Sequence, residues 1–396
     1  MKVCFDTFGC RLNRAEALEM EAAFAERGWI RTEKHSDADL IVVRGCAVTA
    51  KAESEVEKLV AHIRRKYPLK RLVVTGCSRS KRNEHWLRDV AAADAVPSRT
   101  ARAYLKVQDG CSGCCAFCIV PRFRGKAESV PFDDVLAKAS RFIEAGYHEI
   151  VVTGCNLSQY LSGGRRIADL VAALAALSDG CRIRIGSIEP GAAAADAVRA
   201  MSENANVCRF LHVPVQSGST RILSAMRRPY TARDAAELIR LAEKLVPNLG
   251  LGCDLMSGFP GETPNDHLAT LAFLERHPFT NAHVFPYSER PGTPAASLPD
   301  AVPPDVRSAR ARELSFAAQA MREKYARRFK GRSVEIVVEN EEDVSGWTSE
   351  YLWCGVGTDK AKILARRAAA SGGLRKKKMR ILVRKAEGGE LAGDPA

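Results

Sequence analysis

Residues 111–118 read CSGCCAFC, and this cysteine-rich loop decides how the rest of the chain is interpreted. Cys111, Cys115 and Cys118 have the spacing C-x3-C-x2-C, with Cys114 interposed. Three thiolates on one loop can hold three corners of a cubane [4Fe–4S] cluster and leave the fourth iron open to bind a ligand. Using Cys114 instead gives an immediately adjacent pair, which is a strained way to reach three corners. A zinc-binding loop is the alternative, because thiolate-rich loops also suit zinc.

Apolar, β-branched segments alternate with helical patterns on the carboxyl side of this loop. The helical pattern PFDDVLAKASRFIEAG occupies residues 131–146. The strand-like segments are EIVVTG (149–154), RIRIGS (182–187), FLHVPV (210–215), LGLGCDLMSGF (249–259) and NAHVFPY (281–287). Five or six such units in roughly 200 residues predict a full or partial β/α barrel, in which the loops after the strands carry the chemistry.

The same alternation precedes the loop. The strand-like segments VCFDTF, LIVVRG and RLVVTG alternate with helical patterns, which predicts a βαβαβ unit with a parallel sheet. Cys10, Cys46 and Cys77 each follow a glycine at the carboxyl end of one of these strands. Those ends gather at one edge of an open α/β sheet, so the three thiols are expected to meet in space.

The composition changes again from about Lys330. VEIVVEN, SEYLWCGV, AKILARR and MRILVRK alternate like short strands, with no long helix, and an Arg-rich helical segment at 307–331 precedes them. A small antiparallel barrel is expected. The chain is therefore predicted to be an α/β protein in three domains. These are a Rossmann- or flavodoxin-like sheet (1–98), a partial β/α (TIM-like) barrel (99–330) and a small β-barrel (331–396).

Composition limits the class of protein. Thirteen cysteines, an odd number, are too many for inert packing and form a poor disulfide framework, which favours metal binding. A net charge of +13 suggests a polyanionic partner. No run of 18 apolar residues appears, and MKVCFDTFGCR lacks the layout of a signal peptide. A cytoplasmic protein with no membrane segment is expected.

Several segments resemble known enzymes. The C-x3-C-x2-C spacing with an aromatic residue, Phe117, before the third cysteine resembles the radical S-adenosylmethionine (SAM) enzymes. Within them the chain resembles the methylthiotransferases over nearly its whole length, and its C-terminal part resembles a TRAM domain, a small RNA-binding barrel. The segments that carry this likeness are TFGCRLNRAE, GCAVTAKAE, VVTGCS, KVQDGC, RIRIGSIEP, LHVPVQSGSTRILSAMRRPYT, DLMSGFPGET and YSERPGTPAA.

The resemblance implies two [4Fe–4S] clusters and SAM as cofactors. One cluster cleaves SAM to a 5′-deoxyadenosyl radical, and the auxiliary cluster carries the sulfur that a second SAM methylates. An unidentified electron donor is needed, and a monomer is expected. The implied ligands are Cys111, Cys115 and Cys118 for the radical SAM cluster, and Cys10, Cys46 and Cys77 for the auxiliary cluster.

The resemblance also implies contacts to SAM, although turn or strand-end roles remain alternatives for these residues. Cys155, in TGCN, is not expected to be a ligand, and Arg124 with Gly125 fits the family's Arg-Gly after the cluster loop. His212 is assigned no role. The implied SAM-binding residues are Phe117, Gly154, Asn156, Ser187, Glu189, Gln216, Ser217 and Gly258.

The expected substrate is tRNA. TFGCRLN, GCAVTA and LKVQDGC most resemble the MtaB-type branch, which methylthiolates N6-threonylcarbamoyladenosine at position 37. The alternatives are N6-isopentenyladenosine, a ribosomal-protein aspartate, or a non-enzymatic zinc or iron–sulfur RNA-binding protein. Tyr351 and Trp353 either stack on a base or belong to the barrel core. A basic run either contacts phosphates or forms a solvated turn; it comprises Arg375, Lys376, Lys377, Lys378 and Arg380.

Two departures from the family pattern concern the N-terminal domain. The segment between Cys77 and Cys111 is short, so the sheet is expected to be truncated and the auxiliary cluster less enclosed. Arg44 and Gly45 replace the usual Asn-Thr before Cys46, which changes the expected local hydrogen bonding.

Overall fold

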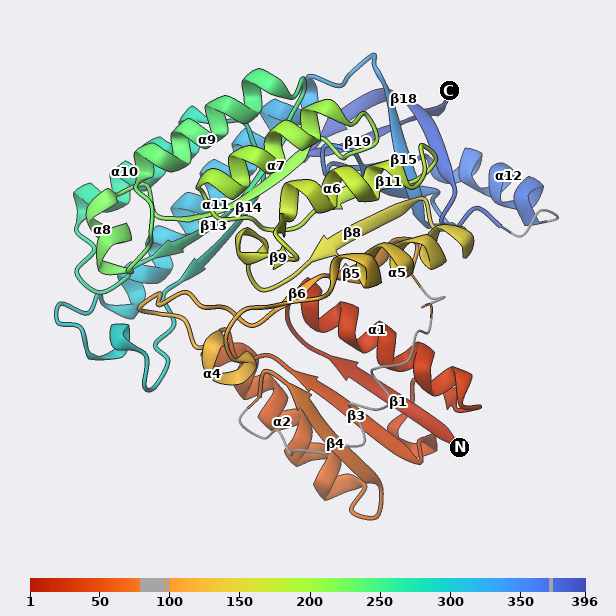
Figure 1. Ribbon diagram of the computed structural model, residues 1–396, viewed down its shortest axis with the longest axis horizontal. Coiled ribbons are helices and arrows are strands. Elements are labelled where there is room, and N and C mark those ends of the chain that lie inside the picture. Colours follow the sequence, from red (N-terminus) through yellow and green to blue (C-terminus); the bar gives the residue numbers. More distant parts are fainter. Residues whose placement is uncertain (79–95, 97–99, 370–372) are drawn as a thin grey trace.

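The computed structural model describes residues 1–78, 96, 100–369 and 373–396. The N-terminal sheet, the central α/β part and the C-terminal barrel follow one another along the chain (Figure 1). Most of the segment between Cys77 and Cys111, on which the expected truncation depends, lies outside the described residues. Among the described helices, none is both long and apolar enough to cross a membrane.

The N-terminal part is a parallel sheet in the order β2-β1-β3-β4. The three predicted strands are present, and the two-residue β2 adds an edge. Helices α1 and α2 bury apolar side chains against the sheet, among them Phe24 from α1 and Val56 from α2. The elements are β1 (Lys2–Thr7), α1 (Arg11–Glu26), β2 (Ile30–Arg31), η1 (His35–Asp37), β3 (Leu40–Gly45), α2 (Ala50–Lys66) and β4 (Arg71–Gly76).

The central part is a partial barrel of parallel strands. Its two sheets have the orders β11-β8-β5 and β12-β13-β14, and isolated parallel bridges, Ile183 to Val207 and Ser187 to His212, connect them. The main strands and helices are β5 (Ala103–Lys106), α4 (Val120–Arg124), α5 (Phe132–Glu144), β8 (Glu149–Thr153), α6 (Ile167–Ala176), β11 (Arg182–Ile185), α7 (Ala192–Glu203), β12 (Phe210–Gln216), α8 (Thr220–Ala225), α9 (Ala232–Leu245), β13 (Gly250–Ser257), α10 (Pro264–Arg276), β14 (Phe279–Pro286) and α11 (Pro304–Arg327). The short elements are β6 (Gln108–Asp109), β7 (Glu128–Ser129), η2 (Leu157–Gln159), β9 (Leu161–Ser162), β10 (Arg165–Arg166) and η3 (Pro294–Ser297).

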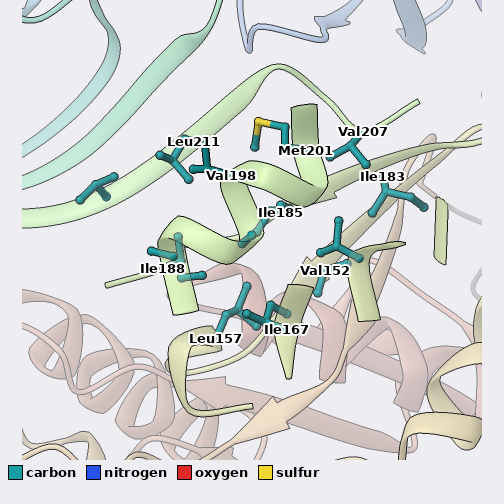
Figure 2. Close-up of a cluster of buried hydrophobic side chains, with 14 of the residues drawn as sticks. Val152, Leu157, Ile167, Ile183, Ile185, Ile188, Val198, Met201, Val207 and Leu211 are labelled. Atoms are coloured by element: carbon teal, nitrogen blue, oxygen red, sulfur yellow. The ribbon is translucent and has the colours of Figure 1, made fainter. Parts of the chain in front are cut away.

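The largest apolar core lies between these strands and their helices. Figure 2 shows Ile183 and Ile185 of β11 and Leu211 of β12 close to Val198 and Met201 of α7. Because side chains alternate along a strand, the residues between these apolar ones face the interior of the barrel. The interior is therefore lined by the polar members of the same strands.

The C-terminal part is a closed barrel in the order β15-β16-β17-β19-β18. The predicted small barrel is present, but two details are wrong. β17 and β19 pair in parallel, and AKILARR, expected as a strand, lies in helix α12. This segment is rich in Ala, Lys, Leu and Arg, whose helix propensity outweighs the short alternation. The elements are β15 (Ser333–Asn340), β16 (Ser345–Thr348), β17 (Trp353–Val356), α12 (Thr358–Ala369), β18 (Lys378–Glu387) and β19 (Glu390–Pro395).

A fully buried carboxylate, Glu149, joins the two barrels. It accepts hydrogen bonds from Arg182 Nε at 2.5 Å and Arg184 Nε at 2.7 Å. The outer nitrogens of Arg184 donate to the carbonyl oxygens of Thr348 and Ser349 at 2.8 and 3.0 Å. Burial raises the pKa of Glu149, but the arginine charges outweigh burial and hold that pKa well below its usual range. The amino-terminal end of the central barrel is thus attached to β16 by ionic and backbone contacts.

Tyr351 is shared by all three parts. Its ring stacks on Phe210 of β12 and on Trp347 of β16, with centroid distances of 4.6 and 4.3 Å. Its hydroxyl accepts a hydrogen bond from Arg11 Nη2 of α1 at 2.9 Å. Trp353 meets Trp347 edge to face at 5.1 Å. These contacts favour the core interpretation of both aromatic residues over base stacking.

We expect the substitution Glu149→Gln to lower the free energy of unfolding by about 3–5 kcal/mol, because it leaves buried arginine charges without their counter-charge. Urea-induced unfolding at pH 7 measures the effect. The depressed pKa means that this contribution is present at neutral pH and is lost as the pH falls below the ordinary glutamate value. The exposed pair of Asp196 and Arg199 supplies the control: Asp196→Asn should cost less than about 1 kcal/mol. Equal losses from the two substitutions would contradict this account.

Candidate active site

The predicted site residues gather at the carboxyl end of the central barrel. The cysteine loop follows β5 and β6, Gly154 to Asn156 follow β8, and Ser187 and Glu189 follow β11. Gln216 ends β12 and Gly258 follows β13. This is the end of a β/α barrel where active sites form. The carboxyl ends of β1, β3 and β4, which carry the second set of cysteines, lie close to the same loops.

The cysteine loop is held in a tight conformation. Gly110 has φ +62°, and a Cβ there would lie 1.9 Å from the carbonyl oxygen of Lys126, so only glycine fits. Cys111, Cys115 and Cys118 are partly buried, whereas Cys114 is exposed. Burial, with smaller contributions from neighbouring thiols, raises the pKa of Cys118 to about 11. The three thiols of the predicted trio therefore lie inside the site and the interposed one outside it.

Arg228 contacts both the cysteine loop and the loop after β11. Its Nη1 donates to Cys115 Sγ at 3.1 Å, and its Nη2 lies 2.6 Å from Glu189 Oε1. Its Nε donates to the Tyr230 hydroxyl at 2.9 Å. Burial raises the pKa of Cys115, and the Arg228 charge opposes that shift, which favours the thiolate that iron requires. The sequence analysis did not identify Arg228, because nothing in the spacing of MRRPYT points to a thiol.

The second trio comes together at the carboxyl edge of the N-terminal sheet. Cys46 and Cys77 are buried and Cys10 is exposed. A Cβ on Gly9 would lie 2.8 Å from Cys46 Sγ, which shows how closely the turn before Cys10 approaches that thiol. Burial raises the pKa of Cys46, and the charges of Cys10 and Cys77 raise it further. The prediction that three strand ends bring these thiols together agrees with this geometry.

Arg124 connects the segment after the cysteine loop to the second trio. It lies in α4, directly after the cysteine loop, and its Nε donates to Cys77 Sγ at 3.0 Å. Its Nη1 donates to Asp109 Oδ1 at 2.8 Å, and its Nη2 lies 3.0 Å from Glu16 Oε2. Burial raises the pKa of both carboxyls, but the surrounding Arg and Lys charges outweigh burial and leave each pKa below its usual range. The two carboxylates fix the guanidinium against the Cys77 thiol.

The unusual Arg44-Gly45 pair also belongs to this arrangement. Arg44 is buried and pairs with Glu16, the same carboxylate that holds Arg124. The carbonyl oxygen of Gly45 accepts hydrogen bonds from Asn13 Nδ2 at 2.7 Å and from the Cys77 backbone at 3.0 Å. The departure from the family pattern therefore comes with local ionic and backbone contacts of its own, although Arg44 Nε has no hydrogen-bond partner among the described residues.

Three predicted SAM contacts lie together in the loops after β8 and β11. A Cβ on Gly154 would lie 2.8 Å from Gln108 Oε1, so glycine allows this close approach. Gln108 Oε1 in turn accepts from the Asn156 backbone at 2.9 Å. Asn156 Nδ2 donates to Glu189 Oε2 at 2.8 Å, and its Oδ1 caps η2 by accepting from the Ser158 backbone. Their part in SAM binding stays a prediction.

The other residues predicted to contact SAM differ in how far they are exposed. Gln216 is buried with φ +67°, and its Oε1 lacks a hydrogen-bond partner among the described residues. Ser217 is buried and its hydroxyl lies 3.2 Å from Thr270 Oγ1, so it holds its loop to α10. Ser187 is exposed, and Phe117 is partly buried against an apolar cluster.

Gly258 has a structural reason to be glycine. Its φ is +70°, and a Cβ there would lie 2.2 Å from Arg307 Cγ. Its backbone N–H donates to the Glu262 carboxylate. Approach of this backbone to a nucleotide stays a prediction, and the packing of α11 is sufficient to explain the residue.

Cys155 lies nearer the second trio than the sequence indicated. Its Sγ is 3.6 Å from Asp109 Oδ1. Burial raises its pKa, and Asp109, Cys10 and Cys77 raise it further despite the nearby Arg124. Its exclusion from the ligand set stays a prediction.

Two side chains in the basic run of the C-terminal barrel make contacts within the protein. Lys376 Nζ lies 3.7 Å from the centroid of the Tyr147 ring, and Lys378 Nζ lies 3.1 Å from Glu335 Oε1. Arg375 and Arg380 are exposed. A role in RNA binding stays a prediction for the run, and these two arginines are its accessible members.

Comparisons with known proteins agree with this geometry. Family models match residues 105–274 (Radical SAM superfamily) and residues 2–97 (Uncharacterized protein family UPF0004). A tRNA-2-methylthio-N(6)-dimethylallyladenosine synthase of Chlorobium chlorochromatii (strain CaD3) is 31% identical, with 92% of each chain aligned. Threonylcarbamoyladenosine tRNA methylthiotransferase MtaB of Bacillus subtilis (strain 168) is 30% identical over 88% of this chain and 89% of its own. The chain belongs to the radical SAM methylthiotransferase family.

Membership of this family makes the chain an enzyme with SAM and [4Fe–4S] as cofactors. The solved structure of TsrM from Kitasatospora setae, a radical S-adenosylmethionine methyltransferase, has a TM-score of 0.54 at 13% identity. The match covers 74% of this chain and 75% of TsrM, and it shows the fold alone.

We expect the substitution Arg228→Met to weaken retention of iron by the CSGCCAFC loop about 10- to 100-fold, the usual effect of losing an outer partner of a metal ligand. The measurement is iron loss to a chelator from anaerobically reconstituted protein in which Cys10, Cys46 and Cys77 are replaced by Ala. Arg233→Met, at an exposed position of α9, is the matched control and should not change iron retention. Equal retention in both variants would show that the Arg228 contact to Cys115 is unimportant.

Proposed function

We propose that this enzyme adds a methylthio group to carbon 2 of N6-threonylcarbamoyladenosine at position 37 of tRNA, by a radical SAM mechanism with two [4Fe–4S] clusters. Cys111, Cys115 and Cys118 hold the radical SAM cluster. Cys10, Cys46 and Cys77 hold the auxiliary cluster.

The observation that carries this proposal is the contact of Arg124 with Cys77. A guanidinium that directly follows one cysteine loop donates at 3.0 Å to a thiol of the other trio. Sulfur insertion needs the radical centre and the sulfur donor at one substrate carbon. This contact holds the segment that follows the radical SAM loop against the second trio, which supports that requirement.

The residues at each trio suit thiolate ligands. A buried thiol resists ionisation, and a neighbouring guanidinium favours the thiolate. Among the described residues, such contacts are made by Arg228 to Cys115 and by Arg124 to Cys77. When bound, the cofactors supply the radical and the methylated sulfur. Glu16 and Asp109 position Arg124, and Glu189 and Tyr230 position Arg228.

The choice of nucleoside rests on sequence segments rather than on overall identity. The relatives named for the dimethylallyl and the threonylcarbamoyl substrates are 31% and 30% identical, which does not separate them. TFGCRLN, GCAVTA and LKVQDGC favour the threonylcarbamoyl substrate. We place the tRNA against the mouth of the central barrel, with exposed Arg375 and Arg380 available for phosphates.

We expect deletion of the gene to remove 2-methylthio-N6-threonylcarbamoyladenosine from tRNA, and re-expression to restore it. Mass spectrometry of tRNA nucleosides measures both. Loss of the methylthiolated isopentenyl nucleoside instead would assign the enzyme to that branch. Unchanged tRNA together with loss of methylthiolation on a ribosomal protein would overturn the proposal.

We expect cysteine substitutions to separate the two reactions. Cys118→Ser should abolish both SAM cleavage and methylthiolation, because the radical SAM cluster loses a ligand. Cys77→Ser should lower methylthiolation at least about 100-fold while 5′-deoxyadenosine still forms, because only the auxiliary cluster is affected. Cys114→Ser, at the exposed interposed thiol, is the control and should retain both activities. Loss of SAM cleavage in Cys77→Ser, with the protein folded, would contradict the division into two trios.

A further inference from the structure

Three polar side chains line one wall inside the central barrel. His212, Asp254 and His283 lie on the neighbouring strands β12, β13 and β14. Their strand neighbours, among them Leu211 and Cys253, belong to the apolar core between strands and helices. By alternation, the three polar side chains face the barrel interior instead.

The three side chains share one carboxylate oxygen. His212 Nε2 lies 3.2 Å from Asp254 Oδ1, and His283 Nδ1 lies 3.1 Å from the same atom. The two imidazole rings are 5.4 Å apart. A Cβ on Gly252 would lie 2.5 Å from His212 Nδ1, so the ring occupies the space that glycine leaves. The local sequence is therefore arranged to admit this ring.

The group is incompletely partnered. His212 is 2% exposed; its Nε2 faces Asp254 Oδ1, whereas its Nδ1 has no hydrogen-bond partner among the described residues. His283 has an exposed side chain, at 54%, and opens the group to the interior. Buried polar groups are nearly always hydrogen-bonded, so an unpaired one beside an opening points to a ligand.

The position suits one part of the proposed substrate. Carbon 2 of the adenine must reach the radical centre at the mouth of the barrel. Carbon 6, which carries the N6 substituent, is separated from carbon 2 by a single ring nitrogen. The substituent therefore lies beside the reacting carbon, within reach of the walls below the mouth, where β12 to β14 present these side chains.

The geometry points to recognition of the polar N6 substituent of the nucleoside by His212, Asp254 and His283. A threonylcarbamoyl group offers N–H donors, carbonyl and carboxylate acceptors and a hydroxyl, whereas an isopentenyl group offers none of them. An apolar substituent would leave the buried polar atoms unpaired, and sites built for hydrogen bonds strongly reject such analogues. This inference rests on the proposed function and adds to it the residues that select the substrate.

The same atoms could in principle hold a divalent cation, but one contact favours hydrogen bonding. Asn281 Nδ2, which can only donate, lies 3.3 Å from His283 Nε2. The ring proton of His283 then lies on Nδ1, where it faces Asp254 Oδ1. A protonated Nδ1 donates to the carboxylate and is not free to bind a metal.

Selectivity between two tRNAs tests the inference. The enzyme, reconstituted with its clusters, is given tRNA carrying either N6-threonylcarbamoyladenosine or N6-isopentenyladenosine, and kcat/KM for methylthiolation is measured with 5′-deoxyadenosine formation. We expect His283→Phe and Asp254→Asn each to lower kcat/KM for the threonylcarbamoyl tRNA about 10- to 100-fold, with SAM cleavage and tRNA affinity retained. The ratio of kcat/KM for the threonylcarbamoyl tRNA to kcat/KM for the isopentenyl tRNA should therefore fall as well. His62→Phe, at an exposed position of α2, is the matched control and should leave that ratio unchanged.

The outcomes separate this inference from the proposed function. Wild-type enzyme that modifies only the isopentenyl tRNA would refute the proposed function itself. Wild-type enzyme that prefers the threonylcarbamoyl tRNA, with both variants keeping that preference, would refute the inference alone. One zinc ion per chain in the wild type, absent from His283→Phe, would overturn it in favour of a metal site.

Discussion

A single guanidinium, that of Arg124, connects the parts of the chain that carry the cysteines. It extends from α4, after the radical SAM loop, to Cys77 at the edge of the N-terminal sheet. A buried charge of this kind is costly unless it is fully paired, and Glu16 and Asp109 pair it. Arg44 and Lys106 complete the pairing of Glu16. The relative position of the two cysteine trios therefore depends on one ionic network with contributions from both parts.

A second ionic network fixes the opposite end of the barrel. Glu149 with its arginines reaches the backbone of β16, and Tyr351 adds contacts to β12 and α1. The C-terminal barrel is thereby attached both to the amino-terminal end of the central barrel and to Arg11, which directly follows Cys10. Two of its predicted phosphate contacts, Lys376 and Lys378, are used in attaching or stabilising it. Arg375 and Arg380 of the same run are exposed.

The sequence was informative about candidate site residues where a cysteine directly follows the end of a strand. The positions of Cys10, Cys46 and Cys77 after glycines predict that their thiols gather, because parallel strands end at a common edge. It was uninformative for Arg228 and His283, whose partners lie 113 and 29 residues away. When the register of the strands is unknown, a local sequence pattern does not show which side chains face the inside of the barrel. The error at α12 has a different cause, since a short apolar alternation fits both a helix and a strand.

The polar groups inside the barrel divide into two kinds, and the difference bears on the chemistry. Glu149, Arg182 and Arg184 are paired with one another and with backbone carbonyls, as a structural network in a low-dielectric interior must be. His212, nearer the mouth, has a ring nitrogen, Nδ1, with no hydrogen-bond partner among the described residues. A radical enzyme has reason to exclude water from its interior, because water and side reactions compete for the intermediate. The polar substrate group that we propose would pair with this nitrogen during turnover.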